Sequence, residues 1–117
     1  TDPAVVEASR LDWSALQTTP GEDWHALHRR LLARRLEVVV PLLGRVTPGH
    51  AERRTAGPGG LEVRWRLDGG GVLTLVANLA ARPQPWSGEA RGQAFFHTHE
   101  GTGGTLPSWY VAWYRGG

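Results

Sequence analysis

The chain has 117 residues, 40% of them apolar, which is enough for one small domain with its own core. Its 13 basic residues are all arginine and exceed the 11 acidic residues by two, so the weak net field argues against a nucleic-acid partner. The chain has no cysteine and no apolar stretch long enough to cross a bilayer, so we expect a cytoplasmic protein without disulfides or a membrane partner.

The first clear element is an amphipathic helix from about Thr19 to Val39. Thr19 can cap it, Pro20 suits the first helical position, and Glu22 can complete a capping box. An apolar stripe runs along one face, and Pro41 and Gly44 are expected to end the helix. The stripe comprises Trp24, Leu27, His28, Leu31, Leu32, Arg35, Val38 and Val39, and the opposite face carries Arg29, Arg30, Ala33, Arg34 and Glu37.

After Gly44 the apolar pattern changes to the period of two that is typical of strands. Residues 61–67 alternate apolar with charged side chains, so Glu62, Arg64 and Arg66 are expected on a solvent-exposed face. The turn residues 68–71 lead into a partner strand at 72–79, and a short strand at 52–56 comes before the pair.

Two further strands are predicted beyond the loop at 80–92. Residues 93–98 favour one, and residues 109–115, with aromatic side chains on both faces, favour another in the centre of a sheet. We therefore predict a mainly β fold, an antiparallel β-sandwich preceded by one amphipathic α-helix.

The sequence offers no convincing catalytic residues. Glycoside hydrolysis needs two carboxylates held across the sugar linkage, and the acidic residues here are scattered among turns, caps and strand faces. Asp12, between Leu11 and Trp13, is interpreted as a structural hydrogen-bonding group. We expect no cofactor.

His97 and His99 have a spacing that two metal ligands can use. A third ligand would have to come from His25, His28, His50 or a distant carboxylate, so no metal site is predicted.

The six tryptophans raise the alternative of a sugar-binding surface. Trp24, Trp65 and Trp113 lie on stripes that favour burial. Trp86, close to Pro85 and Gly88, and Trp109, at a strand start, are the candidate carbohydrate-binding residues.

Four runs carry a family resemblance: Ser9 to Trp13, Trp24 to Arg35, Val39 to Gly44, and Leu106 to Tyr114. With the strand pair at 61–78, and the run 75–79 above all, they resemble in order and spacing the C-terminal region of α-amylase-superfamily enzymes, most closely the malto-oligosyltrehalose trehalohydrolases. Ser108 departs from that pattern, since a second proline is common there, and residues 47–60 match little.

The resemblance implies that residues 1–45 resemble the end of a catalytic barrel and that residues 46–117 form the C-terminal antiparallel β-sandwich. The family's catalytic carboxylates lie in the preceding (β/α)₈ barrel, so none is carried over to this chain. The resemblance implies that the chain is a non-catalytic C-terminal domain of a glycoside hydrolase. That enzyme would cleave an α-1,4-glucosidic linkage to release trehalose, in carbohydrate metabolism and trehalose biosynthesis.

The partner implied by the resemblance is the catalytic barrel, and α-glucan is a further candidate ligand. An isolated chain would expose the apolar surface of the barrel element, which predicts a homodimer. The alternative function is a free-standing starch- or glucan-binding β-sandwich module that uses Trp86 and Trp109.

Overall fold

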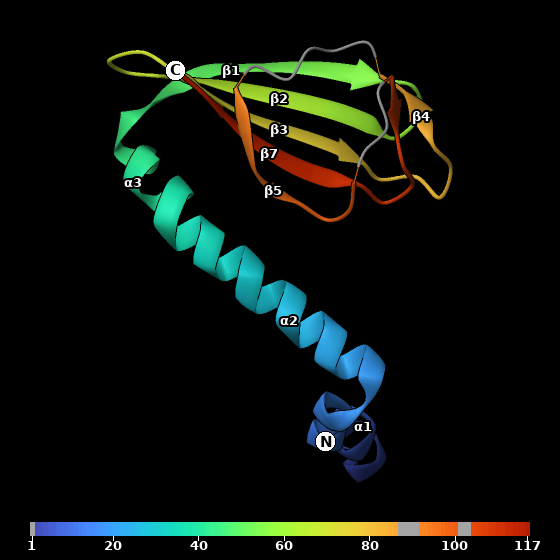
Figure 1. The fold of residues 1–117 in the computed structure, drawn as a ribbon. Helices are drawn as coiled ribbons and strands as arrows, with labels where there is room; N and C mark the ends of the chain where they lie inside the picture. The colour runs from blue at the N-terminus through green and yellow to red at the C-terminus, as the bar shows by residue number, and fades with distance from the viewer. Residues whose placement is uncertain (1, 87–91, 101–103) are drawn as a thin grey trace. The chain divides into compact units, whose positions relative to one another are not determined.

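The computed structural model describes residues 2–86, 92–100 and 104–117 (Figure 1). Contacts within the chain divide it into two compact units, Thr1–Ala33 and Arg34–Gly117, and each is described by itself. Residues 1–45 were expected to resemble the end of a catalytic barrel. That barrel is not part of this chain, so the expectation stays a prediction.

The first unit is helical. It consists of α1 (Pro3–Ala8), the 3-10 helix η1 (Trp13–Gln17) and the long helix α2 (Thr19–Arg34). Asp2 caps α1, because its Oδ1 accepts a hydrogen bond from the Ala4 amide at 2.9 Å. None of the described residues in these three helices is buried, although many are apolar.

Asp12 has the structural role expected of it. Its Oδ1 accepts hydrogen bonds from the Ser14 hydroxyl at 2.6 Å and from the Ser14 amide at 3.0 Å, and these bonds cap η1. Hydrogen bonding favours the charged carboxylate, so the side chain and then the backbone of Ser14 lower the pKa of Asp12.

The helix α2 begins at Thr19 as expected, but its cap is Thr18 and not Thr19. The Thr18 hydroxyl accepts a hydrogen bond from the Gly21 amide at 3.2 Å and donates to the Ala15 carbonyl at 2.6 Å. Thr18 is extended, as a cap residue should be, and it joins η1 to α2 with one side chain.

One helix was expected to run to about Val39 and to be ended by Pro41 and Gly44, but the α-helix α2 ends at Arg34 and helical turns of other kinds continue to Arg45. A π-helical turn η2 (Arg35–Val39) is followed by α3 (Val40–Leu42) and a 3-10 turn η3 (Leu43–Arg45). Pro41 cannot donate a backbone hydrogen bond, and its ring would meet the carbonyl four residues earlier in a regular helix. The wider turn, in which the Val40 amide donates to the Arg35 carbonyl, accommodates Pro41 at the start of α3.

The second unit contains the predicted antiparallel β structure (Figure 1). Five strands pair in the order β1-β2-β3-β7-β5, and β4 pairs with β6 in a separate small sheet, so the mainly β, sandwich-like fold class is confirmed. The strands are β1 (Val46–Ala56), β2 (Gly60–Leu67), β3 (Val72–Asn78), β4 (Gln84–Pro85), β5 (Gln93–His97), β6 (Thr105–Leu106) and β7 (Val111–Gly116).

The first strand is longer than predicted, since it begins at Val46 and not near residue 52. Val46 pairs with Leu67 and Ala51 with Trp65, and the register is irregular between these pairs. Four residues lie between Val46 and Ala51, Pro48 and Gly49 among them, so this part of β1 cannot keep a regular ladder.

Strand β7 is an inner strand, as its aromatic residues on both faces predicted. On one face Tyr110 and Ala112 form a buried cluster with Val76 and Leu106. On the other face Trp113 stacks on Trp65 with ring centroids 5.8 Å apart, and the end of the helical segment covers this cluster. The second cluster contains Leu42, Leu67 and Leu73, with Val38, Val46, Phe95 and the two tryptophans packed against it.

Candidate functional site

The candidate site lies where the loop after β3 meets the loop before β7. Asn78, the last residue of β3, is fully buried. Its side-chain nitrogen donates to the carbonyls of Arg82 at 2.8 Å, Pro107 at 2.9 Å and Leu106 at 3.2 Å. Its side-chain oxygen accepts from the Ala80 amide at 3.1 Å. A buried polar side chain with every group bonded in this way holds two loops together.

Trp109 projects from the second of these loops. Its φ angle is 55°, and it is the one non-glycine residue with positive φ among the residues described. That conformation is strained for a bulky side chain. The Trp109 amide donates to the Ala80 carbonyl at 3.2 Å, yet the residue is 61% exposed. The backbone is therefore fixed while the indole ring is held in solvent, close in the chain to the buried Tyr110.

Trp86, the other predicted sugar-binding residue, lies in a different environment. It is half-buried and packs against the cluster of Val76, Leu106, Tyr110 and Ala112. Its Nε1 donates to Glu62 Oε2 at 3.4 Å. The described contacts do not bring Trp86 and Trp109 together, and a role of either in binding sugar stays a prediction.

The prediction that Glu62 lies on a solvent-exposed face of β2 was wrong. Glu62 is only 2% exposed, and its carboxylate forms an ion pair with Arg64, two residues along the same strand. Trp86 packs against the cluster on this same face, beside Glu62. Alternation identified the two faces correctly, but a local pattern carries no information on which distant segment covers a face.

Three further carboxylates have structural partners. Asp68 accepts from the Thr47 hydroxyl at 2.5 Å, Glu52 pairs with Arg66 at 2.9 Å, and Glu37 pairs with Arg34 at 3.1 Å. Each acid thus has its own partner in a different part of the fold. This arrangement differs from two carboxylates facing one another across a substrate.

The two histidines considered as metal ligands lie at the end of β5. His97 Nε2 is 3.7 Å from Glu100 Oε1, and the His99 ring packs edge-on against Tyr110 at a centroid distance of 5.3 Å. Within residues 2–86, 92–100 and 104–117, no three metal-ligating side chains converge. The absence of a metal site in the rest of the chain is untested and stays an expectation.

Comparison with known proteins identifies the class to which this β domain belongs. The family described as "Domain of unknown function (DUF3459)" matches residues 48–113, which is more than half of the chain. The chain belongs to this family. A DUF3459 domain is a C-terminal domain of α-amylase-family enzymes, so the match supports the α-amylase superfamily.

A solved structure gives a second line of evidence. The chain is similar to a 1.4 Å crystal structure described as a "Putative alpha Amylase" from Salmonella typhimurium, with 26% sequence identity and a TM-score of 0.85. The similarity covers 99% of this chain and 20% of the other, so this chain spans about one fifth of that protein's length. No curated protein matches the chain.

No helix among the described residues combines the length and the hydrophobicity needed to span a membrane.

Proposed function

We propose that the chain is the non-catalytic C-terminal part of a malto-oligosyltrehalose trehalohydrolase-like enzyme. The parent would hydrolyse an α-1,4-glucosidic linkage and release trehalose, and its catalytic barrel would be the partner of this chain. The family match and the likeness to an amylase-type structure support the glycoside hydrolase class. The order and spacing of the sequence motifs favour the trehalohydrolase subfamily.

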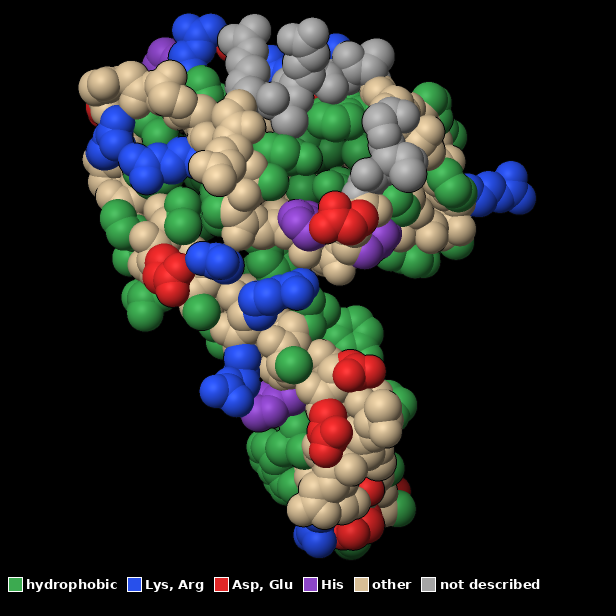
Figure 2. Space-filling model, viewed as in Figure 1, with side chains coloured by type: hydrophobic (Ala, Val, Ile, Leu, Met, Phe, Trp, Pro, Cys, Tyr) green, Lys and Arg blue, Asp and Glu red, His purple; other side chains and the backbone are tan. Residues whose placement is uncertain are grey.

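The observation that carries this proposal is the exposed apolar surface of the first unit. Trp13 is 71% exposed, Leu11 69%, Trp24 63% and Leu32 60%. Figure 2 shows hydrophobic side chains at the surface of this helical part of the chain. Single exposed apolar residues are normal, but several large ones within one small helical unit indicate a surface that another domain covers.

A shallow groove on this surface supports the same interpretation. Thr19, Pro20, Asp23, Trp24 and Leu27 line a depression of about 430 Å³ at the start of α2. Trp24 and Leu27 belong to the predicted stripe, so the depression lies on the face that we propose to be covered. A side chain of the barrel that entered it would bury the Trp24 ring.

The test uses the complete parent enzyme. The parent should release trehalose from malto-oligosyl trehalose. An ordinary amylase would instead cut amylose into malto-oligosaccharides and release no trehalose. The 117-residue chain alone should release neither. Hydrolysis by the chain alone would contradict the non-catalytic assignment, and a parent that acts only on amylose would contradict the subfamily.

Variants of the parent test the packing surface separately. Leu31→Glu with Leu32→Glu places charges on the apolar stripe and should lower the parent's melting temperature. Arg29→Glu with Ala33→Glu makes the same kind of change on the opposite face of α2 and should leave it nearly unchanged. Equal effects of the two pairs would contradict the proposed barrel contact.

A second candidate is favoured by one observation, the exposed and strained Trp109. As a free-standing glucan-binding module, the chain would stack a pyranose ring on this indole. Retardation in a native gel containing starch measures such binding. Trp109→Gly should abolish the retardation, and Trp24→Ala, which removes an equally exposed tryptophan from α2, should retain it. Trp86 is the other residue predicted to bind sugar, and Trp86→Phe should weaken the retardation if its indole contacts the glucan.

A further inference from the structure

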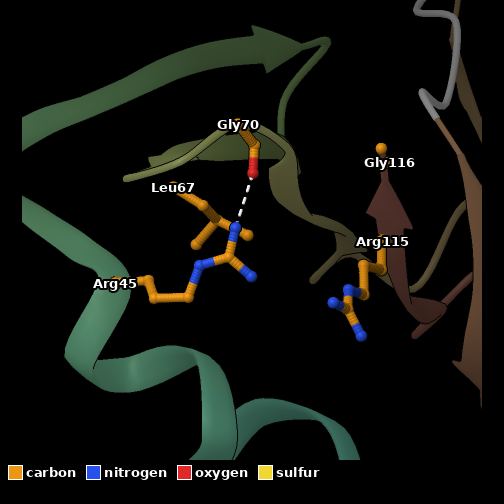
Figure 3. Close-up of a pocket in the computed structure, with 6 residues that line it drawn as sticks. Arg45, Leu67, Gly70, Arg115 and Gly116 are labelled. Carbon is orange, nitrogen blue, oxygen red and sulfur yellow. Dashed lines mark hydrogen bonds between the residues drawn. The ribbon is translucent and has the colours of Figure 1, made fainter.

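The second unit contains a cavity of about 300 Å³ beyond the parts already discussed (Figure 3). It lies between the turn that joins β2 to β3, the end of β7 and the helical turn η3. Its lining residues are Arg45, Leu67, Gly70, Arg115, Gly116 and Gly117. Both charged side chains in this set are arginines, and they come from opposite ends of the sequence of this unit. Gly117 also lines the cavity and carries the terminal carboxylate of the 117-residue chain.

Arg45 is held rigidly in this cavity. Its Nε donates to the Asp68 carbonyl at 2.9 Å and its Nη2 to the Gly70 carbonyl at 2.7 Å. The Arg45 carbonyl in turn accepts from the Asp68 amide at 2.7 Å. Gly70 has a φ of 98°, which is the left-handed region that favours glycine, and the turn presents its carbonyl to the guanidinium.

Arg115 approaches the same cavity from β7. Arg115 lies opposite Leu73 on β3 and opposite Gln93 on β5. It is on the same face of β7 as Trp113, which packs against the cluster of Leu42, Leu67 and Leu73. Arg115 is exposed, and Figure 3 shows its side chain across the cavity from Arg45. Among the described residues, no carboxylate forms an ion pair with either arginine. The carboxylate of Asp68 accepts from Thr47 and does not line the cavity.

We propose that the cavity between Arg45 and Arg115 binds an oxyanion, a phosphate or a carboxylate, between the two guanidinium groups. Two like charges at one cavity repel, and an anion between them removes the repulsion. The planar guanidinium fork suits oxyanions because it offers two parallel N–H donors. The anion would thus contact a preorganised donor, Arg45, whose guanidinium is held by two backbone carbonyls, and an exposed donor, Arg115.

The pocket size and its glycines limit the ligand. Ligand cavities begin at about 300 Å³, so this one suits a small anion or the anionic group of a larger molecule. Gly70 and Gly116 leave their backbone without side chains at the cavity wall, and a Cβ at Gly70 would meet no atom within 4 Å. The open space beside Gly70 leaves room for an anion next to the guanidinium of Arg45, which the Gly70 carbonyl holds in place.

The experiment is an NMR titration of the 117-residue chain at constant ionic strength, with inorganic phosphate in one arm and acetate in the other. We expect saturable shifts of the Gly70 and Gly116 amides in at least one arm, and the arm that saturates identifies the oxyanion. Arg115→Gln should weaken binding about tenfold, because one of two charge-assisted contacts is lost. Arg53→Gln, an exposed arginine on β1, should bind as the unmodified chain does.

Two further arms keep the proposal falsifiable. Arg115→Lys retains the charge without the fork and should bind less tightly than the unmodified chain and more tightly than Arg115→Gln. A chain extended past Gly117 by a Gly-Ser tail moves the terminal carboxylate away and should bind at least as well. Shifts that do not saturate in either arm, or an Arg115→Gln variant with unchanged affinity, would overturn the proposal.

Discussion

The side-chain amide of Asn78 donates a hydrogen bond to the Pro107 carbonyl at 2.9 Å, although the two residues are 29 positions apart in the chain. The same amide bonds the Arg82 carbonyl, so one buried side chain connects the loop after β3 to the loop before β7. The backbone of Asn78 adds a third link, since its amide donates to the Tyr110 carbonyl at 2.7 Å. The position of Trp109 thus depends on a residue at the end of another strand.

Replacing Asn78 should destabilise the second unit strongly. Asn78→Ala leaves three buried or partly buried carbonyls and the Ala80 amide without their partner, and each unsatisfied buried group is costly. We expect a loss of about 2–4 kcal/mol in the free energy of unfolding, measured by urea denaturation. Gln93→Ala removes an exposed amide side chain from β5 and should cost little. Similar losses for the two variants would contradict the role assigned to Asn78.

Trp109 should show an inverted preference between glycine and alanine. At an ordinary position Gly is less stable than Ala by about 0.5–1 kcal/mol. At a φ of 55° an alanine retains the left-handed strain, which costs about 1–2 kcal/mol, and a glycine does not. Trp109→Gly should therefore have a higher urea midpoint than Trp109→Ala. The ordinary order would show that the strain at this residue is relieved in solution.

Much of the sheet could be predicted from local sequence because its strands alternate and its turns contain glycine. The strand pair at 61–67 and 72–79 was expected within a residue or two of the observed β2 and β3. Local patterns failed where distant contacts decide. Glu62 reads as a surface residue and is buried.

Only part of the candidate site could be predicted from the sequence. Trp109 was identified by its residue type, but its positive φ depends on loop closure. Asn78 lies in the run 75–79 that resembles the family, but its bonding role had no signal except its place at the end of an apolar strand, where a polar residue usually begins a turn. The cavity at Arg45 joins residues 70 positions apart in the chain, a distance that no periodicity can report. The continuation of the helix past Pro41 was missed because a π turn has no sequence signature.

Tyr110 should make the fold sensitive to alkaline pH. Burial first, and then the hydrogen bond with Tyr114, raises the pKa of Tyr110 well above the value of 10.0 in an unfolded chain. Between those two pKa values the folded state binds more protons than the unfolded state, so stability falls as pH rises. The stability from this group is fully present below pH 10 and is lost above it.

Urea midpoints measured at about pH 9 and about pH 11 test this dependence, because these values lie on either side of the unfolded pKa. The midpoint should fall between them in the unmodified chain, and it should fall less in Tyr110→Phe, which has no ionisable hydroxyl. An identical fall in both would assign the dependence to another group.

Asp12 should give the opposite dependence in acid. Its folded pKa is lowered, so the cap on η1 is present above the ordinary Asp pKa of 3.8 and is lost as pH falls through the lower folded value. The Ser14 amide proton reports this cap directly, since it donates to the carboxylate. Its chemical shift should titrate with a midpoint below 3.8. Asp12→Asn should remove that titration, and a midpoint above 3.8 would contradict the hydrogen-bonded geometry.

The exposed apolar surface of the first unit should make the isolated chain self-associate. Leu11, Trp24 and Leu32 are each more than half exposed, and pairing two copies would remove this surface from water at a gain of about 25 cal/mol per Å². Light scattering should show an apparent mass that rises with protein concentration. Leu32→Glu should shift the chain toward the monomer, because a charge on the stripe opposes burial, whereas Arg29→Glu on the opposite face of α2 should not. A chain that stays monomeric at all concentrations would show that this surface needs no cover, and it would weaken the inference that a barrel covers it.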